Sequence, residues 1–235
     1  MIILHPRLIS DFSRKPQNMS LVYGDPGAVL ANRREFLGGL GIPYLDVVCP
    51  KQAHGHHVEH VTAAHRGRGA VSWDSAVIDT DALITDVVGL PVAIFTADCL
   101  SIFLYDPKHH ALGLVHAGWK STHQNVTPGT VALMRARFDT KPADLFVGFG
   151  PAIRQCCFQV GEEFGGLFTT GLSRRGSHYY LDLVGVNRSE LLKLGVADGH
   201  MSDSGFCTSC RNSEFYSYRR EGAGCGRMMS VMMLT

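Results

Sequence analysis

Two apolar runs in the middle of the chain dominate its hydrophobic pattern. Residues 92–107 read VAIFTADCLSIFLYDP and residues 111–122 read ALGLVHAGWKST, with a short linker between them. Both runs have strand character. The first run carries Cys99 and the second carries His116, so the pattern predicts two strands that each present one reactive side chain.

The rest of the pattern predicts further helices and strands in alternation. Helix starts are indicated at Asp25-Pro26 and Thr127-Pro128, where a capping side chain precedes a proline at the first helical position. Residues 1–24, 66–74 and 203–210 read as irregular segments or loops. We expect helices over residues 26–40, 128–138, 161–168 and 187–194, and strands over residues 45–49, 58–61, 145–149, 179–183, 215–218 and 228–234.

The order of these elements predicts one α/β (α+β) domain that spans residues 1–235. Strands and helices are interleaved, yet several strands follow one another closely enough to form hairpins. This order favours mixed β-sheets flanked by helices over a purely parallel sheet. The sequence contains no internal repeat, low-complexity segment or clear linker that would divide it.

The composition is that of a globular protein with a substantial core. Hydrophobic residues make up 45% and charged residues 18% of the chain, and the formal net charge is +1. A nearly neutral chain argues against a broad nucleic-acid or membrane surface, although it is compatible with a local basic pocket. We therefore expect no nucleic-acid partner, no membrane partner, and a monomer or weak homodimer.

The seven cysteines indicate the compartment and raise the question of a metal. Their number is odd, and the N-terminus lacks a basic segment followed by an apolar one, so we predict a cytoplasmic protein with free or metal-bound thiols. Cys207 and Cys210 form a C-x-x-C pair, but a structural zinc site needs a second pair. The adjacent Cys156 and Cys157 have poor chelating spacing. We therefore expect Cys207 and Cys210 to pack or to line a pocket wall, with a redox pair as the less favoured alternative.

Cys99 and His116 are compatible with two kinds of chemistry. Together with His54 they would form a His₂Cys set for a transition metal with an open fourth position. Alternatively, His116 would activate Cys99 as a nucleophile, with Asp81 or Asp98 orienting the imidazole. Cys99 also fits a plain buried position, because free cysteine is among the most buried residue types. The residues alone leave these three interpretations open.

Several cationic residues are candidates for an anion site. Arg33 on the first helix, Lys120 after the second apolar run, and the Arg219-Arg220 pair could bind phosphate. The sequence has no P-loop and no G-x-G-x-x-G loop, so side chains and scattered backbone N–H groups would have to hold it. For Asp81, a turn is the favoured role.

A set of short motifs, in this order along the chain, resembles the laccase-domain family. That family was once described as multicopper polyphenol oxidoreductases. Its members are now regarded as purine nucleoside phosphorylases with adenosine deaminase activity, and some bacterial members are called peptidoglycan editing factors. The likeness runs from about Asn18 to the C-terminus. The motifs are Asn32-Arg33, Gln52-Ala53-His54-Gly55, Thr96-Ala97-Asp98-Cys99, Val115-His116-Ala117-Gly118-Trp119, Gly150-Pro151-Ala152-Ile153 with Cys156-Cys157, and Tyr218-Arg219-Arg220 with Gly226-Arg227.

The resemblance implies a fold, a metal and two reactions. The family fold is a mixed α/β sandwich related to Cys–His deamidase toxins. The family binds one zinc ion, or copper, at positions that match His54, Cys99 and His116, which would be both metal ligands and catalytic residues. The reactions are phosphorolysis of adenosine, inosine, guanosine and methylthioadenosine to free base and ribose 1-phosphate, and hydrolytic deamination of adenosine. The substrate-binding candidates are Arg33, Gln52, Asp98, Lys120 and Arg220.

This sequence departs from the family pattern at a few places. Ala53 stands where valine is usual, and residues 62–78 match no family motif. Lys120 stands where arginine is frequent, which keeps the charge but loses the bidentate fork. We predict a zinc-dependent purine nucleoside phosphorylase with adenosine deaminase activity. The alternatives are a metal-free Cys–His hydrolase or peptidoglycan-editing amidase, a copper-dependent polyphenol oxidase, and a non-enzymatic binding module.

Overall fold

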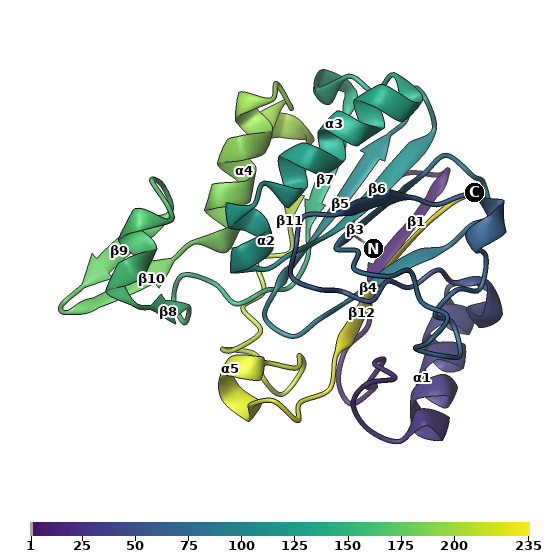
Figure 1. Ribbon diagram of the computed structural model, residues 1–235, viewed down its shortest axis with the longest axis horizontal. Coiled ribbons are helices and arrows are strands. Elements are labelled where there is room, and N and C mark those ends of the chain that lie inside the picture. Colours follow the sequence, from purple (N-terminus) through teal and green to yellow (C-terminus); the bar gives the residue numbers. More distant parts are fainter. Residues whose placement is uncertain (1) are drawn as a thin grey trace.

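The two central strands bury side chains on both of their faces. Every residue of β5 (Leu100–Asp106) and β6 (Ala111–Ala117) is buried in the computed structural model, which describes residues 2–235. Successive side chains of a strand point to opposite faces. Ile102 therefore joins one hydrophobic cluster, while its neighbour Phe103 joins another. The β5–β6 hairpin lies at the centre of the molecule, and other elements pack on both of its faces (Figure 1).

This hairpin is the centre of a six-stranded mixed sheet. The strand order is β11-β7-β5-β6-β3-β2, and the pairing is antiparallel except at the two edges, where β2 joins β3 and β11 joins β7 in parallel. The predicted mixed sheet is therefore confirmed. The outer strands are β2 (Val58–His60), β3 (Ala82–Thr85), β7 (Phe146–Phe149) and β11 (Met201–Asp203).

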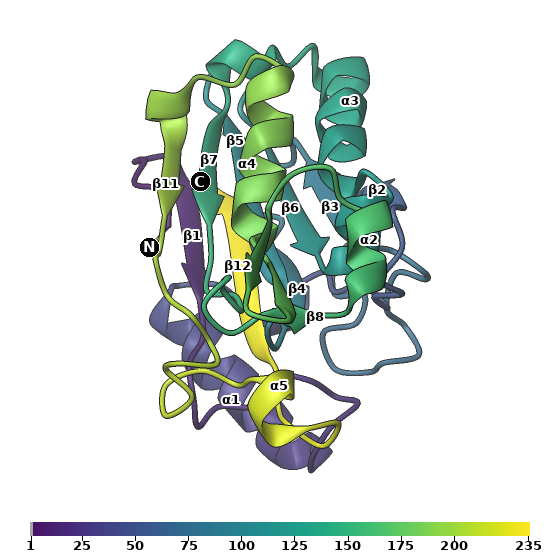
Figure 2. The ribbon, with the colours of Figure 1, turned by 90° about the vertical axis from the view of Figure 1, so that its left-hand side faces the viewer.

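Helices cover one face of this sheet (Figure 2). Val131 and Met134 of α3 pack into the same cluster as Ile102. Gly113 of β6 permits this close approach, because a Cβ atom there would lie 3.0 Å from Met134 Sδ. The helices of this layer are α2 (Trp119–His123), α3 (Val126–Phe138) and α4 (Leu183–Lys193).

A second sheet covers the opposite face. It is antiparallel, with the order β1-β12-β4, and Met232 packs with Phe103 between the two sheets. A helix, α1, closes its outer side, where Leu37 packs with Val231. The layers of the molecule are therefore, in order, the helices, the six-stranded sheet, the β1-β12-β4 sheet and α1. The elements are β1 (Leu8–Phe12), β4 (Val92–Thr96), β12 (Met228–Leu234) and α1 (Pro26–Gly39).

A small antiparallel sheet and a short helix complete the structure. The small sheet has the order β8-β10-β9 and projects from the body beside α4 (Figure 1). The elements are β8 (Gln159–Val160), β9 (Leu172–Arg175), β10 (His178–Leu181) and α5 (Tyr218–Glu221), with 3₁₀ turns at Tyr44–Asp46, Ala63–His65, Pro142–Asp144, Glu162–Gly166 and Asp198–His200.

One of the two helix-start signals is confirmed. Asp25 accepts a hydrogen bond from the backbone N–H of Ala28 at 2.8 Å, and α1 begins at Pro26 as predicted. Helix α3 ends at Phe138 as expected, but it begins at Val126, so Thr127 does not cap it. Strand β12 matches its predicted range. The helix expected over residues 187–194 begins earlier, at Leu183, because Asp182 caps it through Gly185 N.

Several local predictions are wrong. The apolar run of residues 92–107 is not one strand but forms β4 and β5, which belong to different sheets. Residues 1–24 are not wholly irregular, since β1 pairs with β12 from the other end of the chain. Residues 45–49 form no regular strand, because Val48 and Pro50 make single bridges to different partners. The helix expected over residues 161–168 is only a 3₁₀ turn that ends in two glycines. The strand expected over residues 215–218 is replaced by the start of α5, where Asp98 accepts from the N–H of Arg219.

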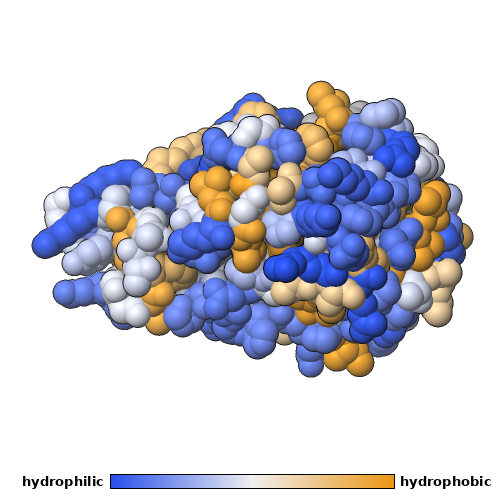
Figure 3. All heavy atoms as spheres, turned by 90° about the horizontal axis from the view of Figure 1, so that it is seen from above, coloured by the Kyte–Doolittle hydropathy of each residue, from blue (hydrophilic) through white to orange (hydrophobic). Residues whose placement is uncertain are grey.

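The surface mixes polar and apolar side chains. On the face seen in Figure 3, apolar groups are small and are separated by polar ones. The large exposed apolar residues include Leu4, Leu45 and Leu192, which lie far apart in the sequence. No helix within residues 2–235 is both long and apolar enough to cross a membrane.

Candidate functional site

The reactive side chains lie where the ends of several strands of the central sheet meet. Cys99 lies in the short link between β4 and β5, and His116 is the last residue but one of β6. Antiparallel pairing aligns Ser101 of β5 with His116, so the thiol and the imidazole lie at the same end of the hairpin. The loop before β2 brings His54 to the same strand ends, although His54 lies more than 40 residues before Cys99 in the sequence.

The structure brings the three expected metal ligands together. One ligand atom each of His54, Cys99 and His116 lies within 4.8 Å of the other two. The two imidazole rings meet edge to face, with their centroids 4.9 Å apart. His116 is buried, Cys99 is half-buried and His54 is exposed, so the group is open to solvent on one side.

Asp81 holds this arrangement from behind. Its buried carboxylate lies 2.7 Å from His116 Nδ1 and accepts hydrogen bonds from the backbone N–H groups of His54 at 3.0 Å and Gly55 at 2.7 Å. Burial by itself would raise the pKa of Asp81, but its contacts with His116 and the loop N–H groups lower it. Asp81 therefore orients a ligand, the role that was not favoured from the sequence, and it leaves His116 Nε2 free for a metal.

Cys99 and His116 form a charged pair when no metal is bound. Burial by itself would raise the pKa of the Cys99 thiol, but the His116 charge and hydrogen bonds from both histidines lower it to about 6. Burial would lower the pKa of His116, but Cys99 and Asp81 raise it to about 9. The lowered pKa of the thiol favours the thiolate, the form that both a metal site and a nucleophile require.

The donor set fits a catalytic zinc ion. Two imidazoles and one thiolate with an open side are a recognised ligand set for zinc, and an Asp–His contact behind a ligand is the usual supporting interaction. Gly118 keeps the space beside the sulfur clear, since a Cβ atom there would lie 3.0 Å from Cys99 Sγ and 3.3 Å from His54 Cδ2. A set of nitrogen and sulfur ligands also accepts copper.

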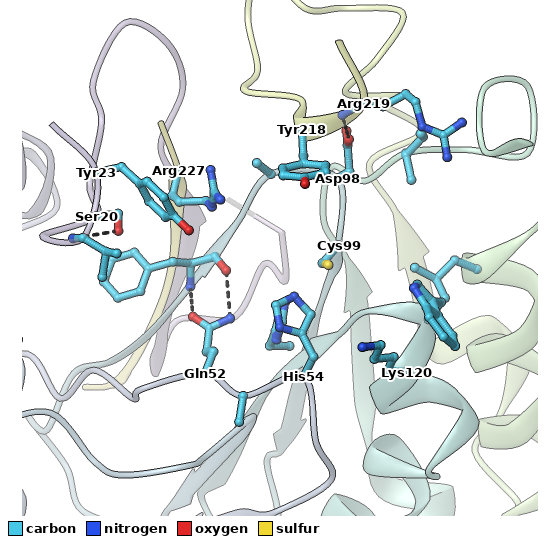
Figure 4. A pocket seen from close by; sticks show the side chains of 18 of the residues that line it. Ser20, Tyr23, Gln52, His54, Asp98, Cys99, Lys120, Tyr218, Arg219 and Arg227 are labelled. Atoms are coloured by element: carbon cyan, nitrogen blue, oxygen red, sulfur yellow. Dashed lines mark hydrogen bonds between the residues drawn. The ribbon is translucent and has the colours of Figure 1, made fainter. Parts of the chain in front are cut away.

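These residues line a cavity of about 670 Å³ (Figure 4). This volume is within the range of small-molecule sites. Tyr23 and Tyr218 lie on the same side of the cavity as Arg227, with His54 and Cys99 at its centre. Aromatic rings contribute much of the lining: Tyr23, Trp73, Phe95, Trp119, Phe158 and Tyr218.

Three cationic side chains reach the cavity, and they differ in their freedom. Arg219 donates to the carbonyl oxygens of Cys157 at 3.3 Å and Gln159 at 2.9 Å, and the Arg227 guanidinium lies over the Tyr23 ring. The Nζ atom of Lys120 lies 5.5 Å from the centroid of the Trp119 ring, with no hydrogen bond or ion pair to any residue from 2 to 235. Lys120 is therefore the cation best placed to bind an anion.

Two of the predicted substrate-binding arginines lie outside the cavity. Arg33 is almost fully buried, and its guanidinium donates to the carbonyl oxygens of Met19, Gly69 and Ala70, so its role is structural. Arg220 donates to Ser209, and its neighbour Arg219 faces the cavity in its place. A sequence does not indicate which of two adjacent arginines faces a pocket when the helix that carries them is only one turn long.

The two remaining predicted substrate residues line the cavity but are held by protein contacts. Gln52 makes two hydrogen bonds with the backbone of Phe95, at 2.9 and 2.7 Å. Asp98 accepts from Thr208 Oγ1 at 2.6 Å and from Arg219 N at 2.7 Å. The positive φ of 82° at Asp98 and of 57° at His54 is a strained conformation of the kind found at functional sites.

Sequence reasoning missed several residues of the cavity. Tyr23 and Trp73 come from segments that read as irregular, and no pattern marked them. Arg227 belongs to a quoted motif, yet its position over the Tyr23 ring depends on contact between the two ends of the chain. Local spacing carries no signal for such contacts.

The fold and the site define a single-domain α+β protein with a His₂Cys group that could hold a metal ion in an aromatic pocket. The chain belongs to the family described as multi-copper polyphenol oxidoreductase laccase, whose sequence profile matches residues 9–235. The resemblance expected from the ordered motifs is therefore confirmed.

Relatives support this assignment at the level of sequence and structure. The chain is 35% identical over 225 residues to purine nucleoside phosphorylase YlmD of Geobacillus stearothermophilus, covering 92% of this chain and 82% of the relative. It is 29% identical over 203 residues to adenosine deaminase RL5 of an unknown prokaryotic organism, covering 80% and 75%. The crystal structure of Geobacillus stearothermophilus YlmD has a TM-score of 0.93 at 32% identity, covering 97% of this chain and 92% of the other.

Proposed function

We propose that this chain is a zinc-dependent purine nucleoside phosphorylase that also deaminates adenosine. The observation that carries the proposal is the His54–Cys99–His116 group at the centre of a cavity of about 670 Å³ lined by aromatic rings and cations. The names of the YlmD and RL5 relatives support both activities.

In this proposal His54, Cys99 and His116 hold the zinc ion. When bound, zinc supplies Lewis-acid polarisation to a reactant in the pocket. The Cys99 thiolate contributes a negative charge without the help of a base, because its pKa is already lowered to about 6. Asp81 keeps the His116 ring turned so that Nε2 faces the site.

The rest of the pocket is suited to a purine nucleoside and phosphate. Flat rings such as Tyr23, Phe95 and Tyr218 offer stacking surfaces for a purine, which is an aromatic and largely apolar group. Lys120 offers a free ammonium group for phosphate. In phosphorolysis a phosphate oxygen bonds to C1′ of the sugar as the bond from C1′ to the purine nitrogen breaks. In deamination water replaces the amino group at C6, which leaves as ammonia.

Replacement of Cys99 by alanine tests the proposal. Cys99→Ala removes the only sulfur of the three-ligand group, so we expect loss of zinc from this site together with phosphorolysis and deamination, while the fold survives. Purine release from adenosine and inosine with phosphate, inosine formation from adenosine, and zinc content by elemental analysis measure the three effects. Circular dichroism checks the fold.

Cys49→Ala is the matched control. Cys49 is a buried free thiol in the hydrophobic cluster between α1 and the β1-β12-β4 sheet, and it does not line the cavity. Its loss should therefore leave both activities intact. Full adenosine turnover by Cys99→Ala would contradict the proposed function.

A Cys–His hydrolase is the second candidate, and one observation favours it. The Cys99 thiolate contacts the His116 imidazole, which in turn contacts the Asp81 carboxylate. This is also the arrangement of a nucleophilic triad. This candidate predicts activity that survives chelation and is lost on alkylation of Cys99. The zinc enzyme instead loses activity on chelation and regains it when zinc is returned.

A further inference from the structure

A second cluster of thiols lies outside the catalytic group. Its four sulfur atoms all lie within 4.8 Å of one another. From the sequence, only Cys207 and Cys210 were expected to pack or to line a pocket wall, and the adjacent pair Cys156-Cys157 was judged to have poor chelating spacing. The structure contradicts the spacing argument, since both neighbours reach the same partner sulfur, at 3.6 and 3.4 Å. We call this group the four-cysteine cluster: Cys156, Cys157, Cys207 and Cys210.

Backbone hydrogen bonds hold the two halves of the cluster in register. Ala152 bridges to Cys207 in parallel, and Thr208 N donates to Ala152 O at 3.0 Å. Within each half, Cys157 N donates to Arg154 O and Arg211 N donates to Cys207 O, both at 2.9 Å. These tight turns bring the sulfurs of each pair to one side, so the cluster needs no rearrangement of the backbone to form.

The sulfur separations agree with a tetrahedral metal site. Zinc–thiolate bonds of about 2.3 Å place the sulfurs of a tetrahedron about 3.8 Å apart, close to the observed 3.4 and 3.6 Å. A disulfide requires about 2.05 Å.

We propose that the four-cysteine cluster binds a second zinc ion through four thiolates, as a structural site. Four cysteines without an open position are the ligand set of structural rather than catalytic zinc. The ion would join the loop that leads to β8 with the loop that leads to α5. Cys156 and Cys210 are exposed, Cys157 is half-buried and Cys207 is buried.

The position of the cluster gives this ion a role in shaping the active-site cavity. Arg219, which lines the cavity, donates to the Cys157 carbonyl, and Thr208, between the cluster cysteines, donates to Asp98 next to Cys99. Zinc at the cluster would therefore fix one wall of the cavity without touching the reacting groups. The inference does not depend on which reaction the cavity performs.

Zinc counting in four proteins tests this inference. The untagged chain, produced with added zinc and purified under reducing conditions, should contain about two zinc ions by elemental analysis. Cys99→Ala and Cys210→Ser should each contain about one, and the double variant about none. Cys210 is exposed, so its replacement by serine should leave the circular dichroism spectrum unchanged. Cys156→Ser, also at an exposed position, serves as a second variant.

Two further measurements assign the metal to the cluster. Cobalt(II) added to metal-free Cys99→Ala should give strong sulfur-to-cobalt charge-transfer absorption that the Cys99→Ala/Cys210→Ser double variant lacks. Cys49→Ala, which removes a thiol outside both groups, should keep the zinc content of the unmodified chain. Unchanged zinc in both Cys210→Ser and Cys156→Ser would overturn the inference. So would an intact mass that shows a disulfide within the cluster under the same purification conditions.

Discussion

At the scale of single residues, Asp81 joins the two parts of the His54–Cys99–His116 group. Its carboxylate contacts the His116 ring on β6 and the backbone of the loop that presents His54. A buried carboxylate in this position fixes both the rotation of one ligand and the path of the loop that carries another. Its side chain is fully buried, so no solvent competes for these contacts.

Asp81→Asn should weaken zinc binding. The amide keeps the shape but loses the charge and part of the hydrogen bonding, and loss of such a supporting contact typically costs tenfold to a hundredfold in metal affinity. Competition with a chromophoric chelator measures this affinity for the catalytic site in the Cys210→Ser background. Asp79→Asn, at an exposed aspartate two residues away, should bind zinc normally. Unchanged affinity in Asp81→Asn would show that the carboxylate does not support the metal.

Lys120 should bind phosphate rather than the nucleoside. Lys120→Met removes the one cavity cation without a hydrogen bond or ion pair within residues 2–235, so we expect the KM for phosphate to rise about tenfold or more. The KM for adenosine in deamination should change little, since that reaction uses no phosphate. Lys120→Arg keeps the charge and should restore most of the phosphate affinity. Equal effects of Lys120→Met on both reactions would argue against a phosphate site here.

At the scale of elements, the β5–β6 hairpin carries His116 at its open end and is stabilised by hydrogen bonds at its turn. Its turn follows Asp106, whose fully buried carboxylate accepts from Lys108 N at 2.9 Å and lies 2.8 Å from His109 Nδ1. Burial by itself would raise the pKa of Asp106, but the hydrogen bonds from His109 and Lys108 lower it below its usual value. The turn is thus held by a carboxylate that is more acidic in the folded than in the unfolded protein.

This shift predicts loss of stability in acid. A carboxyl group with a lowered folded-state pKa stabilises the protein above the usual aspartate pKa of about 4, and this stabilisation is lost as the pH falls through the lower folded value. Asp106→Asn should be less stable than the unmodified chain at pH 7, by about 1.5–3 kcal/mol, and the difference should shrink below about pH 4. Urea unfolding across this pH range measures the effect. The exposed Asp139→Asn is the control, and a difference for Asp106→Asn that does not change with pH would contradict the assignment.

Elements were predictable where the local pattern decides the structure. The long apolar runs of β5, β6 and β12 and the capping signal of α1 lie within single segments, and the structure has all four. Strand β1 was missed because a five-residue strand at the chain end is stable only through its partner β12. The segment around residue 46 was misread because its apolar residues pack without a continuous strand partner.

At the scale of the whole molecule, stacked layers bring the site together. The two sheets pack face to face, so the end of β4 in one sheet lies beside the ends of β3, β5 and β6 in the other. The aromatic wall combines Tyr23 from the N-terminal segment with Tyr218 from α5 near the C-terminus (Figure 4). A cavity built from both ends of the chain exists only when the whole fold has formed.

The sequence by itself determined the fold class, the central hairpin and the ordered motifs that carry His54, Cys99 and His116. These features depend on residue type and short spacing, which local patterns express directly. Only the tertiary structure decided that Asp81 orients His116, that Arg33 is buried away from the cavity, and that Arg219 rather than Arg220 faces it. It also decided that four cysteines from two distant loops meet, because contacts between segments depend on how the layers pack and not on distance along the chain.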